Sequence, residues 1–214
     1  MVKSENIPTP AVRRLSLYLR QLEAFHAHDR RTVSSRQLGE ALSLSDAQVR
    51  KDLAYFGQFG HPGIGYRVPE LIVQVRRILG TDKVSNVLLV GVGNLGRALL
   101  SFRGFSKRGF EIVAAFDKDP AKIGMETQGA HRVRVRPLSE MAKTAQTRSI
   151  RVGILTVPGS AAQATANEMI AAGIRGILNF APVRLQVDDN VWVSSVDLAV
   201  HLEQLSFQIN DTVV

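Results

Sequence analysis

Residues 87–100 read Val-Leu-Leu-Val-Gly-Val-Gly-Asn-Leu-Gly-Arg-Ala-Leu-Leu, and this stretch decides the fold. An apolar run typical of a buried strand leads directly into a G-x-G-x-x-G turn and then into a helix-forming segment. In such a unit the first glycine makes the tight turn, the second lets the backbone approach a pyrophosphate, and the third allows close helix–strand packing. The stretch therefore predicts a dinucleotide site. Its first contacts are expected from Gly91, Val92, Gly93, Asn94, Leu95 and Gly96.

The next expected strand ends at Asp117, 26 residues after Gly91. A carboxylate at this place can accept hydrogen bonds from both hydroxyls of an adenosine ribose, and its charge repels a 2′-phosphate. The position therefore favours NAD over NADP, with Lys118 beside it in the same site. A second interpretation makes Asp117 a turn residue in the sequence Asp-Lys-Asp-Pro, residues 117–120.

Strands alternate with helices from residue 84 onward, which is typical of a parallel sheet with right-handed crossovers, an α/β Rossmann domain. The expected strands are 87–90, 112–116, 152–157 and 176–180, and the expected helices are 94–102, 137–145 and 161–172. Ligands bind at the carboxyl edge of such sheets. Two strand ends there add candidate cofactor residues, although the prolines can also simply end the strands. These candidates are Thr156, Val157, Pro158, Asn179, Phe180, Ala181 and Pro182.

The last segment predicts a strand at 191–196 and an amphipathic helix at 197–207. The helix carries Leu198, Leu202 and Leu205 on one face. An apolar face at a chain end needs a partner surface, in its own subunit or in another one.

The first eighty residues follow a different pattern. Thr9 and Pro10 can cap and open a helix with an apolar stripe, whose other face carries Arg13, Arg14 and Arg20. Two S-x-x-Q segments, 34–37 and 45–48, then predict two capping boxes that open two short helices. Two short helices joined by a tight turn are typical of a helix-turn-helix motif, in which the second helix reads DNA.

On that second helix, burial of Val49 and Leu53 leaves polar side chains outside that suit phosphates and base edges. These are Gln48, Arg50, Lys51 and Tyr55. Alternatively the helix is merely solvated, and Gln48 only caps it.

The glycine-rich segment 57–68 predicts a tight β-hairpin, the wing of a winged helix, or else a surface hairpin without a ligand. A helix opened by Pro69 and closed by Gly80 follows as a linker. We therefore expect three parts: a winged-helix unit with its linker at 1–80, a Rossmann domain at 81–196 and a C-terminal helix at 197–214.

The charge distribution supports a polyanionic partner. Residues 1–80 carry 12 Lys and Arg against 7 Asp and Glu, an excess of 5, while the longer remainder carries 15 against 12, an excess of 3. A positive field favours DNA through phosphate neutralisation and counterion release.

With no cysteine and five scattered histidines, His131 among them, the sequence predicts no metal site. The polar start Met1–Pro8 and the lack of a long apolar run predict a cytoplasmic protein.

A dehydrogenase is a weaker interpretation. Only 130 residues follow residue 84, roughly what the nucleotide fold itself uses. No second domain remains to supply a substrate pocket and a proton-transfer group. His201 is the only histidine that we keep as a candidate proton-transfer group. We therefore expect a sensor and not an enzyme. The alternatives are a small NAD-dependent reductase and a Rossmann protein that binds coenzyme A.

The chain resembles the Rex family of NADH-sensing transcriptional repressors over nearly its full length. The motifs that carry the resemblance are QVRKDLAYFG at 48–57, GIGY at 63–66, GVGNLG at 91–96 and AGIRGILNFAP at 172–182. The resemblance implies a homodimer that binds a palindromic operator with an N-terminal winged helix, and whose C-terminal helix is swapped onto the partner subunit. It also implies that NADH releases the dimer from DNA while NAD⁺ permits binding.

The resemblance further implies residue roles. It places Arg50, Lys51, Tyr55 and Phe56 in the DNA-reading helix or at its end. Together with Ser45, Gln48, His61 and Arg14, these are the expected DNA contacts. Arg20 and Asp197 are expected to form a switch ion pair. Two positions depart from the family: Phe102 lacks the hydroxyl of a frequent tyrosine, and Leu198 replaces a frequent aromatic residue near the nicotinamide. An apolar Leu198 would favour neutral NADH over cationic NAD⁺ because NADH costs less to desolvate.

Overall fold

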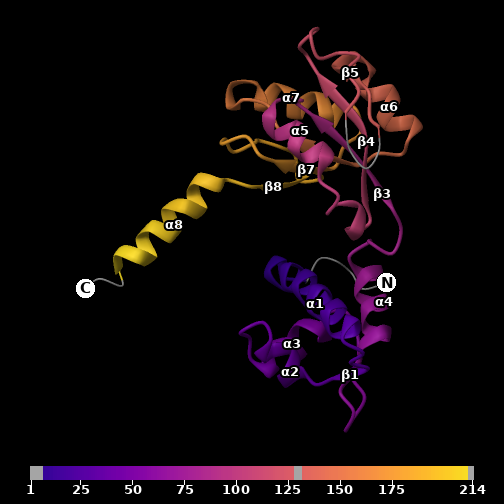
Figure 1. Ribbon diagram of the computed structural model, residues 1–214, viewed down its shortest axis with the longest axis vertical. Helices are drawn as coiled ribbons and strands as arrows, with labels where there is room; N and C mark the ends of the chain where they lie inside the picture. The colour runs from indigo at the N-terminus through magenta and orange to yellow at the C-terminus, as the bar shows by residue number, and fades with distance from the viewer. Residues whose placement is uncertain (1–6, 128–131, 212–214) are drawn as a thin grey trace. The chain divides into compact units, whose positions relative to one another are not determined.

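The computed structural model describes residues 7–127 and 132–211. The chain divides into two compact units, residues 1–83 and 84–214, which we describe separately (Figure 1). Most of the predicted polar start, residues 1–6, and His131 lie outside the described residues. In the described part of the chain, no helix combines the length and the apolar character needed to cross a membrane.

The N-terminal unit is a small helical bundle with a two-stranded sheet. Its elements are α1 (Thr9–Ala27), β1 (Thr32–Val33), α2 (Ser35–Glu40), α3 (Asp46–Ala54), β2 (Tyr66–Arg67) and α4 (Val68–Ile78). The apolar stripes of the helices meet in one core, to which α1 contributes Leu15 and Leu22 and α3 contributes Val49 and Leu53. The predicted helix-turn-helix therefore has a packed hydrophobic core. Thr9, however, does not cap α1, because Pro8 occupies the cap position and Thr9 is already helical.

One of the two predicted capping boxes is present. At α2, the Ser34 hydroxyl accepts the Gln37 N–H at 3.1 Å, and the Gln37 side chain accepts the Ser34 N–H at 3.0 Å. At α3, Ser45 accepts the Gln48 N–H at 3.1 Å, but the Gln48 side chain does not return to Ser45. The prediction of a second capping box is therefore wrong, because the Gln48 side chain donates to the Asp52 carboxylate instead of accepting the Ser45 N–H.

The glycine-rich segment forms less of a hairpin than predicted. Within it a single bridge joins His61 and Gly65, whereas β2 pairs in antiparallel fashion with β1, from the chain before α2. Gly65 has φ +85°, and a Cβ there would lie 2.5 Å from the Val33 carbonyl oxygen. Glycine is required at this position because the backbones approach so closely.

The C-terminal unit is built on a six-stranded parallel sheet of order β5-β4-β3-β6-β7-β8. Its strands are β3 (Ser85–Val90), β4 (Phe110–Asp117), β5 (Val135–Pro137), β6 (Val152–Leu155), β7 (Gly176–Asn179) and β8 (Trp192–Ser195). The helices are α5 (Asn94–Ser101), α6 (Met141–Thr147), α7 (Gly159–Ala171) and α8 (Leu198–Asp211), with short 3-10 turns at Ser106–Arg108 and Leu138–Glu140. The predicted α/β Rossmann fold is confirmed.

Two apolar layers cover the two faces of the sheet. Helices α6 and α7 pack on one face through residues such as Met141 and Met169, and α5 packs on the other through Leu100. The strand order reverses between β3 and β6, so the chain leaves these neighbouring strands toward opposite faces. That divergence opens a crevice at their carboxyl ends, where ligands bind in open α/β sheets.

Helix α8 keeps its apolar side chains exposed. Leu198 is 62% exposed, and Leu202, Leu205, Phe207 and Ile209 are exposed to a similar degree. The helix begins with a side-chain cap, since Asp197 accepts the Ala199 N–H at 3.0 Å. It extends to Asp211, four residues beyond the predicted end.

Candidate functional sites

A cavity of about 760 Å³ lies at the crevice between β3 and β6. Ten of the predicted cofactor residues line it: Gly91, Gly93, Asn94, Leu95, Asp117, Lys118, Thr156, Val157, Pro158 and Phe180. The cavity thus gathers the glycine turn, the acidic strand end and the threonine strand end into one site.

The three glycines of the turn differ in what surrounds them. Gly91 has φ +100°, and a Cβ there would lie 2.7 Å from the Thr156 carbonyl oxygen. A Cβ on Gly96 would lie 2.0 Å from the Gly91 carbonyl oxygen, so α5 and β3 pack too closely for any side chain. A Cβ on Gly93 would meet nothing within 4 Å. Gly91 and Gly96 therefore shape the turn, while Gly93 leaves the start of α5 open to the cavity, as a phosphate group requires.

Thr156 ties the two strand ends together. Its hydroxyl donates to the Gly91 carbonyl at 2.7 Å and lies 3.1 Å from the Val90 carbonyl oxygen. The crevice is therefore held at a fixed width by a side chain that also lines it.

Asp117 is buried at the end of β4 and accepts three hydrogen bonds. The Val92 N–H donates to Oδ2 at 2.7 Å, the Asp119 N–H donates to Oδ1 at 2.9 Å, and the Lys122 ammonium lies 3.2 Å from Oδ2. Burial alone would raise the pKa of Asp117, but the backbone N–H groups and Lys122 lower it overall. The carboxylate is therefore ionised and joins the glycine turn to the β4 loop.

These contacts limit what Asp117 can still accept. A carboxylate has about four acceptor sites, and three of those of Asp117 are already used. One ribose hydroxyl can therefore still donate to Asp117, whereas the sequence predicts hydrogen bonds from both hydroxyls. The turn interpretation also holds, since Asp119 donates back to Asp117 across two residues. A contact with ribose stays a prediction.

Six predicted cofactor residues do not line this cavity: Val92, Gly96, Asn179, Ala181, Pro182 and Leu198. Asn179 is fully buried, and its amide donates to the Val183 carbonyl at 2.9 Å and accepts the Ala181 N–H at 2.9 Å. The structure thus gives Asn179 a role in shaping the turn after β7.

Several lining residues lie outside the sequence predictions: Val90, Asp119, Pro120, Lys122, Leu138, Ala161 and Thr165. Lys122 follows Asp117 in the same loop, which could have suggested it. Ala161 and Thr165 lie one turn apart at the start of α7, directly after the Thr156–Pro158 segment. Their helical spacing was the available signal.

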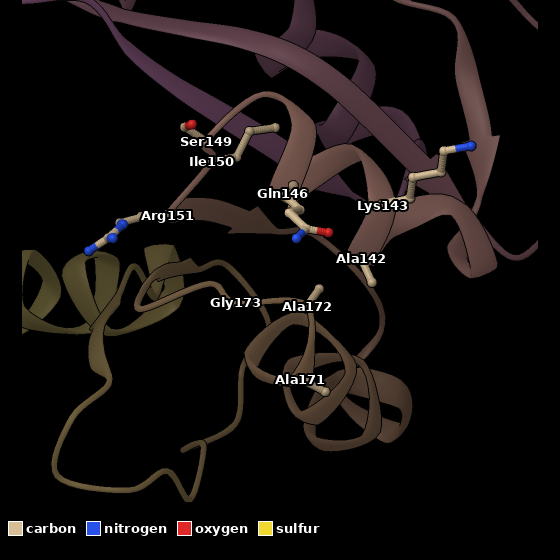
Figure 2. Close-up of a pocket in the computed structure, with 10 residues that line it drawn as sticks. Ala142, Lys143, Gln146, Ser149, Ile150, Arg151, Ala171, Ala172 and Gly173 are labelled. Carbon is tan, nitrogen blue, oxygen red and sulfur yellow. The ribbon is translucent and has the colours of Figure 1, made fainter.

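A second cavity, of about 620 Å³, lies among the ends of α6 and α7 and the turn before β6 (Figure 2). It is at the amino edge of the sheet and so does not share the site built around the glycine turn. Gln146 points into it, whereas Lys143 and Arg151 extend outward in opposite directions (Figure 2). The two cations therefore do not converge on one anion.

In the N-terminal unit, α3 presents Arg50 and Lys51 to solvent, with Tyr55 half-buried at its end. Arg50 donates to the Ser35 hydroxyl at 3.0 Å and to Asp46 at 2.7 Å. His61 is exposed in the glycine-rich turn, with its Nε2 3.9 Å from Glu70. Phe56, by contrast, packs against the core of the unit.

Two predicted DNA contacts, Arg14 and Gln48, are engaged by the buried carboxylate of Asp52. The Arg14 guanidinium donates to both carboxylate oxygens, the Tyr18 hydroxyl donates at 2.7 Å, and the Gln48 amide donates at 2.7 Å. Arg14 therefore points toward Asp52, and its side chain is 25% exposed. Burial would raise the pKa of Asp52, but these hydrogen bonds lower it overall.

The predicted switch residues lie in different units. Arg20 is exposed on α1, and Asp197 caps α8. Phe102 is 56% exposed and packs edge-on against Phe105, with ring centroids 5.1 Å apart.

The fold and the two sites define a class of protein: a dinucleotide-type Rossmann domain joined to a helix-turn-helix unit. Residues 82–183 match the family described as CoA binding domain, and residues 6–54 match the putative DNA-binding protein N-terminus. The chain is 44% identical over 208 residues to a redox-sensing transcriptional repressor Rex from Carboxydothermus hydrogenoformans, covering 97% of this chain and 99% of that one.

Two crystal structures of RSP, a Rex-family repressor, are also similar. The complex with β-NAD⁺ and operator DNA has a TM-score of 0.90 at 36% identity and covers 96% of this chain and 94% of that one. The complex with β-NADH has a TM-score of 0.86 at 34% identity and covers 98% and 97%. This chain belongs to the Rex family of redox-sensing transcriptional repressors, so it is a regulator and not an enzyme.

Proposed function

We propose that this chain is a repressor that binds operator DNA and releases it when NADH occupies the cavity between β3 and β6. This proposal is supported by the Rex-family repressor RSP, which has been crystallised with NAD⁺ and operator DNA and also with NADH. NADH and NAD⁺ are thus the proposed cofactors, and a palindromic operator is the proposed DNA partner. Because operator DNA is the proposed partner, the cytoplasm is the proposed location.

The observation that carries the cofactor proposal is the glycine turn. Gly91 and Gly96 tolerate no side chain, while Gly93 faces open space beside the start of α5. The unpaired N–H groups of a helix start bind phosphate oxygens. The cavity also holds the ionised Asp117 at the place where a ribose hydroxyl would bind. Gly93, Asn94 and Leu95 would therefore hold the pyrophosphate, and Asp117 the adenosine ribose.

The proposed DNA surface is formed by α3 and the glycine-rich turn. Arg50 and Lys51 are cations on the exposed side of a short helix that begins at Ser45. The side chains at the start of a recognition helix contact base edges, and nearby cations bind phosphates. His61 in the glycine-rich turn and Arg14 on α1 would add contacts to the backbone of the DNA.

The exposed face of α8 supports a homodimer. Its apolar side chains are not covered in the described part of a single chain, and such a face is stabilised by a partner. We place the boundaries at 1–80, 81–196 and 197–214, with the last part exchanged between subunits. The partner's Leu198 would then close the nicotinamide end of the cavity, and Asp197 would pair with Arg20 in one of two states of the dimer.

The redox response is tested by titration of DNA binding. Duplexes are first selected from a random pool with the full chain and NAD⁺. Binding of a selected, fluorescently labelled duplex is then measured by anisotropy while NADH or NAD⁺ is added. We expect NADH to lower the DNA affinity at least about tenfold relative to NAD⁺, within the usual range of allosteric coupling. Equal affinities with the two nucleotides would overturn the proposal.

A Gly93→Val variant gives a matched test of the cavity. A Cβ at this position meets nothing within 4 Å in the fold, and the side chain occupies the position beside the expected pyrophosphate. We expect the variant to fold, to bind DNA as the wild type does, and to ignore NADH. An NADH response equal to that of the wild type would place the dinucleotide elsewhere.

Coenzyme A is a second candidate ligand, because residues 82–183 match the CoA binding domain family. The buried, ionised Asp117 disfavours it, since the 3′-phosphate of coenzyme A would lie beside a carboxylate. Calorimetry with NADH and with coenzyme A separates the two. Binding of coenzyme A at lower concentration than NADH would favour the second candidate.

A further inference from the structure

The side chain of Gln48 has a use other than helix capping. Gln48 and Gln37 occupy equivalent places in two S-x-x-Q segments, but only Gln37 returns its side chain to the capping serine. The Gln48 Nε2 instead donates to the Asp52 carboxylate at 2.7 Å. The two glutamines therefore form a natural comparison between a capping amide and a redirected one.

Asp52 fixes which way round the Gln48 amide lies. It is 0% exposed and also accepts from Arg14 and Tyr18, which keeps the carboxylate ionised. An ionised carboxylate accepts hydrogen bonds and donates none. The amide must therefore turn its NH₂ group toward Asp52, because the reverse orientation would set two acceptors against each other.

One N–H and the carbonyl oxygen of the Gln48 amide remain for another partner. A donor and an acceptor side by side match the N7 acceptor and the N6 amino group that adenine presents in the major groove. Gln48 is the third residue of α3, and the first residues of a recognition helix contact base edges. The part of the helix that meets a base thus carries an amide of fixed orientation.

We propose that Gln48 reads an adenine in each operator half-site and that Asp52 is the positioning residue that sets its amide for this contact. The proposal rests on the proposed function of α3 as the DNA-reading helix. It adds which base is read and why the buried aspartate is needed. Asp52 itself does not touch the DNA.

The base contact is tested with the selected operator and single base-pair changes at each position, using the full chain. We expect Gln48→Ala to lose about tenfold discrimination at one A·T pair in each half-site, as a bidentate contact would supply. Replacing that adenine by 7-deazaadenine, which lacks N7, should weaken the wild type but not the Gln48→Ala variant. Gln37→Ala, the matched control on α2, should keep the wild-type preference.

The positioning role is tested with Asp52→Asn, whose amide can donate and so releases Gln48 to lie either way round. We expect this variant to lose its preference at the same A·T pair. Tyr18→Phe leaves the carboxylate and Gln48 in place and should keep the preference, which separates orientation from a general loss of stability.

If Asp52→Asn does not fold, the paired change of Arg14→Met with Asp52→Leu removes both charges and usually preserves folding. It should lose the preference at that pair in the same way. A Gln48→Ala variant that weakens binding equally to every duplex would overturn the base contact. Variants without Asp52 that keep the preference would overturn the positioning role. Loss of the NADH response with base preferences intact would count against the proposed function alone.

Discussion

Each unit of the molecule contains a buried, ionised aspartate beside its candidate site, and the two are held in different ways. Asp117 is held largely by the backbone, through the N–H groups of Val92 and Asp119, with Lys122 as an added cation. Asp52 is held by side chains alone, from Arg14, Tyr18 and Gln48. The first arrangement follows from the course of the chain, whereas the second depends on the identity of three residues.

This difference distinguishes the cofactor site at Asp117 from the DNA surface at Asp52. Backbone donors are present whatever the sequence, so the Asp117 arrangement suits a cofactor shared by many proteins. Side-chain donors can be exchanged one at a time, so the Asp52 arrangement suits a surface that must fit one DNA sequence. Breaking either aspartate should therefore damage one function and leave the other.

The largest effect is expected from Asp52→Ala. Removing one partner of a buried ion pair usually costs 3–5 kcal/mol, but Arg14 is 25% exposed, so water can solvate part of the released charge. We expect a loss of about 3 kcal/mol in the free energy of unfolding of the N-terminal unit. DNA binding should weaken and lose its preference at the A·T pair read by Gln48, while NADH affinity is unchanged. Urea unfolding and calorimetry with NADH measure both, and a parallel loss of NADH affinity would remove the distinction between the units.

Asp117→Ala should have the next largest effect. The Val92 and Asp119 N–H groups lose their acceptor, which costs about 2 kcal/mol. We expect NADH binding to be lost and DNA binding to persist without any response to NADH. The anisotropy titration checks this, and an intact NADH response would show that Asp117 serves the turn alone.

Much of the C-terminal site could be predicted from the sequence because its determinants are local. The glycine spacing, the strand end at Asp117 and the strand end at Thr156 each lie within a few residues of the elements that place them. The hydrogen bond from the Val92 N–H to Asp117 could not be predicted, since it depends on how far β4 extends beside β3.

The cluster that Arg14, Tyr18 and Gln48 form around Asp52 could not be predicted from the sequence, for a different reason. Its partners Arg14 and Tyr18 lie 38 and 34 residues away, and a polar residue on a helix is expected to be exposed. Local spacing predicts a capping box at Gln48, in which the side chain would accept a backbone N–H, but the side chain instead donates to the buried Asp52 carboxylate one turn further along α3. Long-range polar contacts of this kind appear only once the helices are packed.

A third prediction concerns pH. Both aspartates have a lowered pKa in the folded protein, so their contribution to stability is present above the unfolded value of about 4 and is lost as the pH falls below it. The Tyr18 pKa is raised instead, so its contribution is lost as the pH rises above about 10. We expect unfolding free energies of Asp52→Asn and Asp117→Asn to fall less steeply than the wild type in acid. Identical slopes in urea titrations from pH 3 to 6 would contradict this.

The smallest effect distinguishes two lysines that line the same cavity. Lys122 lies 3.2 Å from Asp117, whereas Lys118 is exposed in the same loop. We expect Lys122→Met to lower stability by less than about 1 kcal/mol, because the ammonium is partly solvated, and to weaken NADH binding severalfold. Lys118→Met, the matched control, should change stability by no more than about 0.3 kcal/mol. Equal effects of the two changes would assign no role to the contact with Asp117.

The coupling between the NADH cavity and the DNA surface can be measured from both sides. Because linkage is mutual, the factor by which saturating NADH weakens DNA binding by the nucleotide-free dimer must equal the combined factor by which the operator weakens binding of the two NADH molecules. Calorimetric titration of NADH into the free chain and into the chain saturated with operator duplex gives the second factor. We predict that the operator lowers the combined NADH affinity of the dimer at least about tenfold, by the same factor as that by which NADH weakens DNA binding of the nucleotide-free chain in the anisotropy titration. An NADH affinity unchanged by the operator would contradict it.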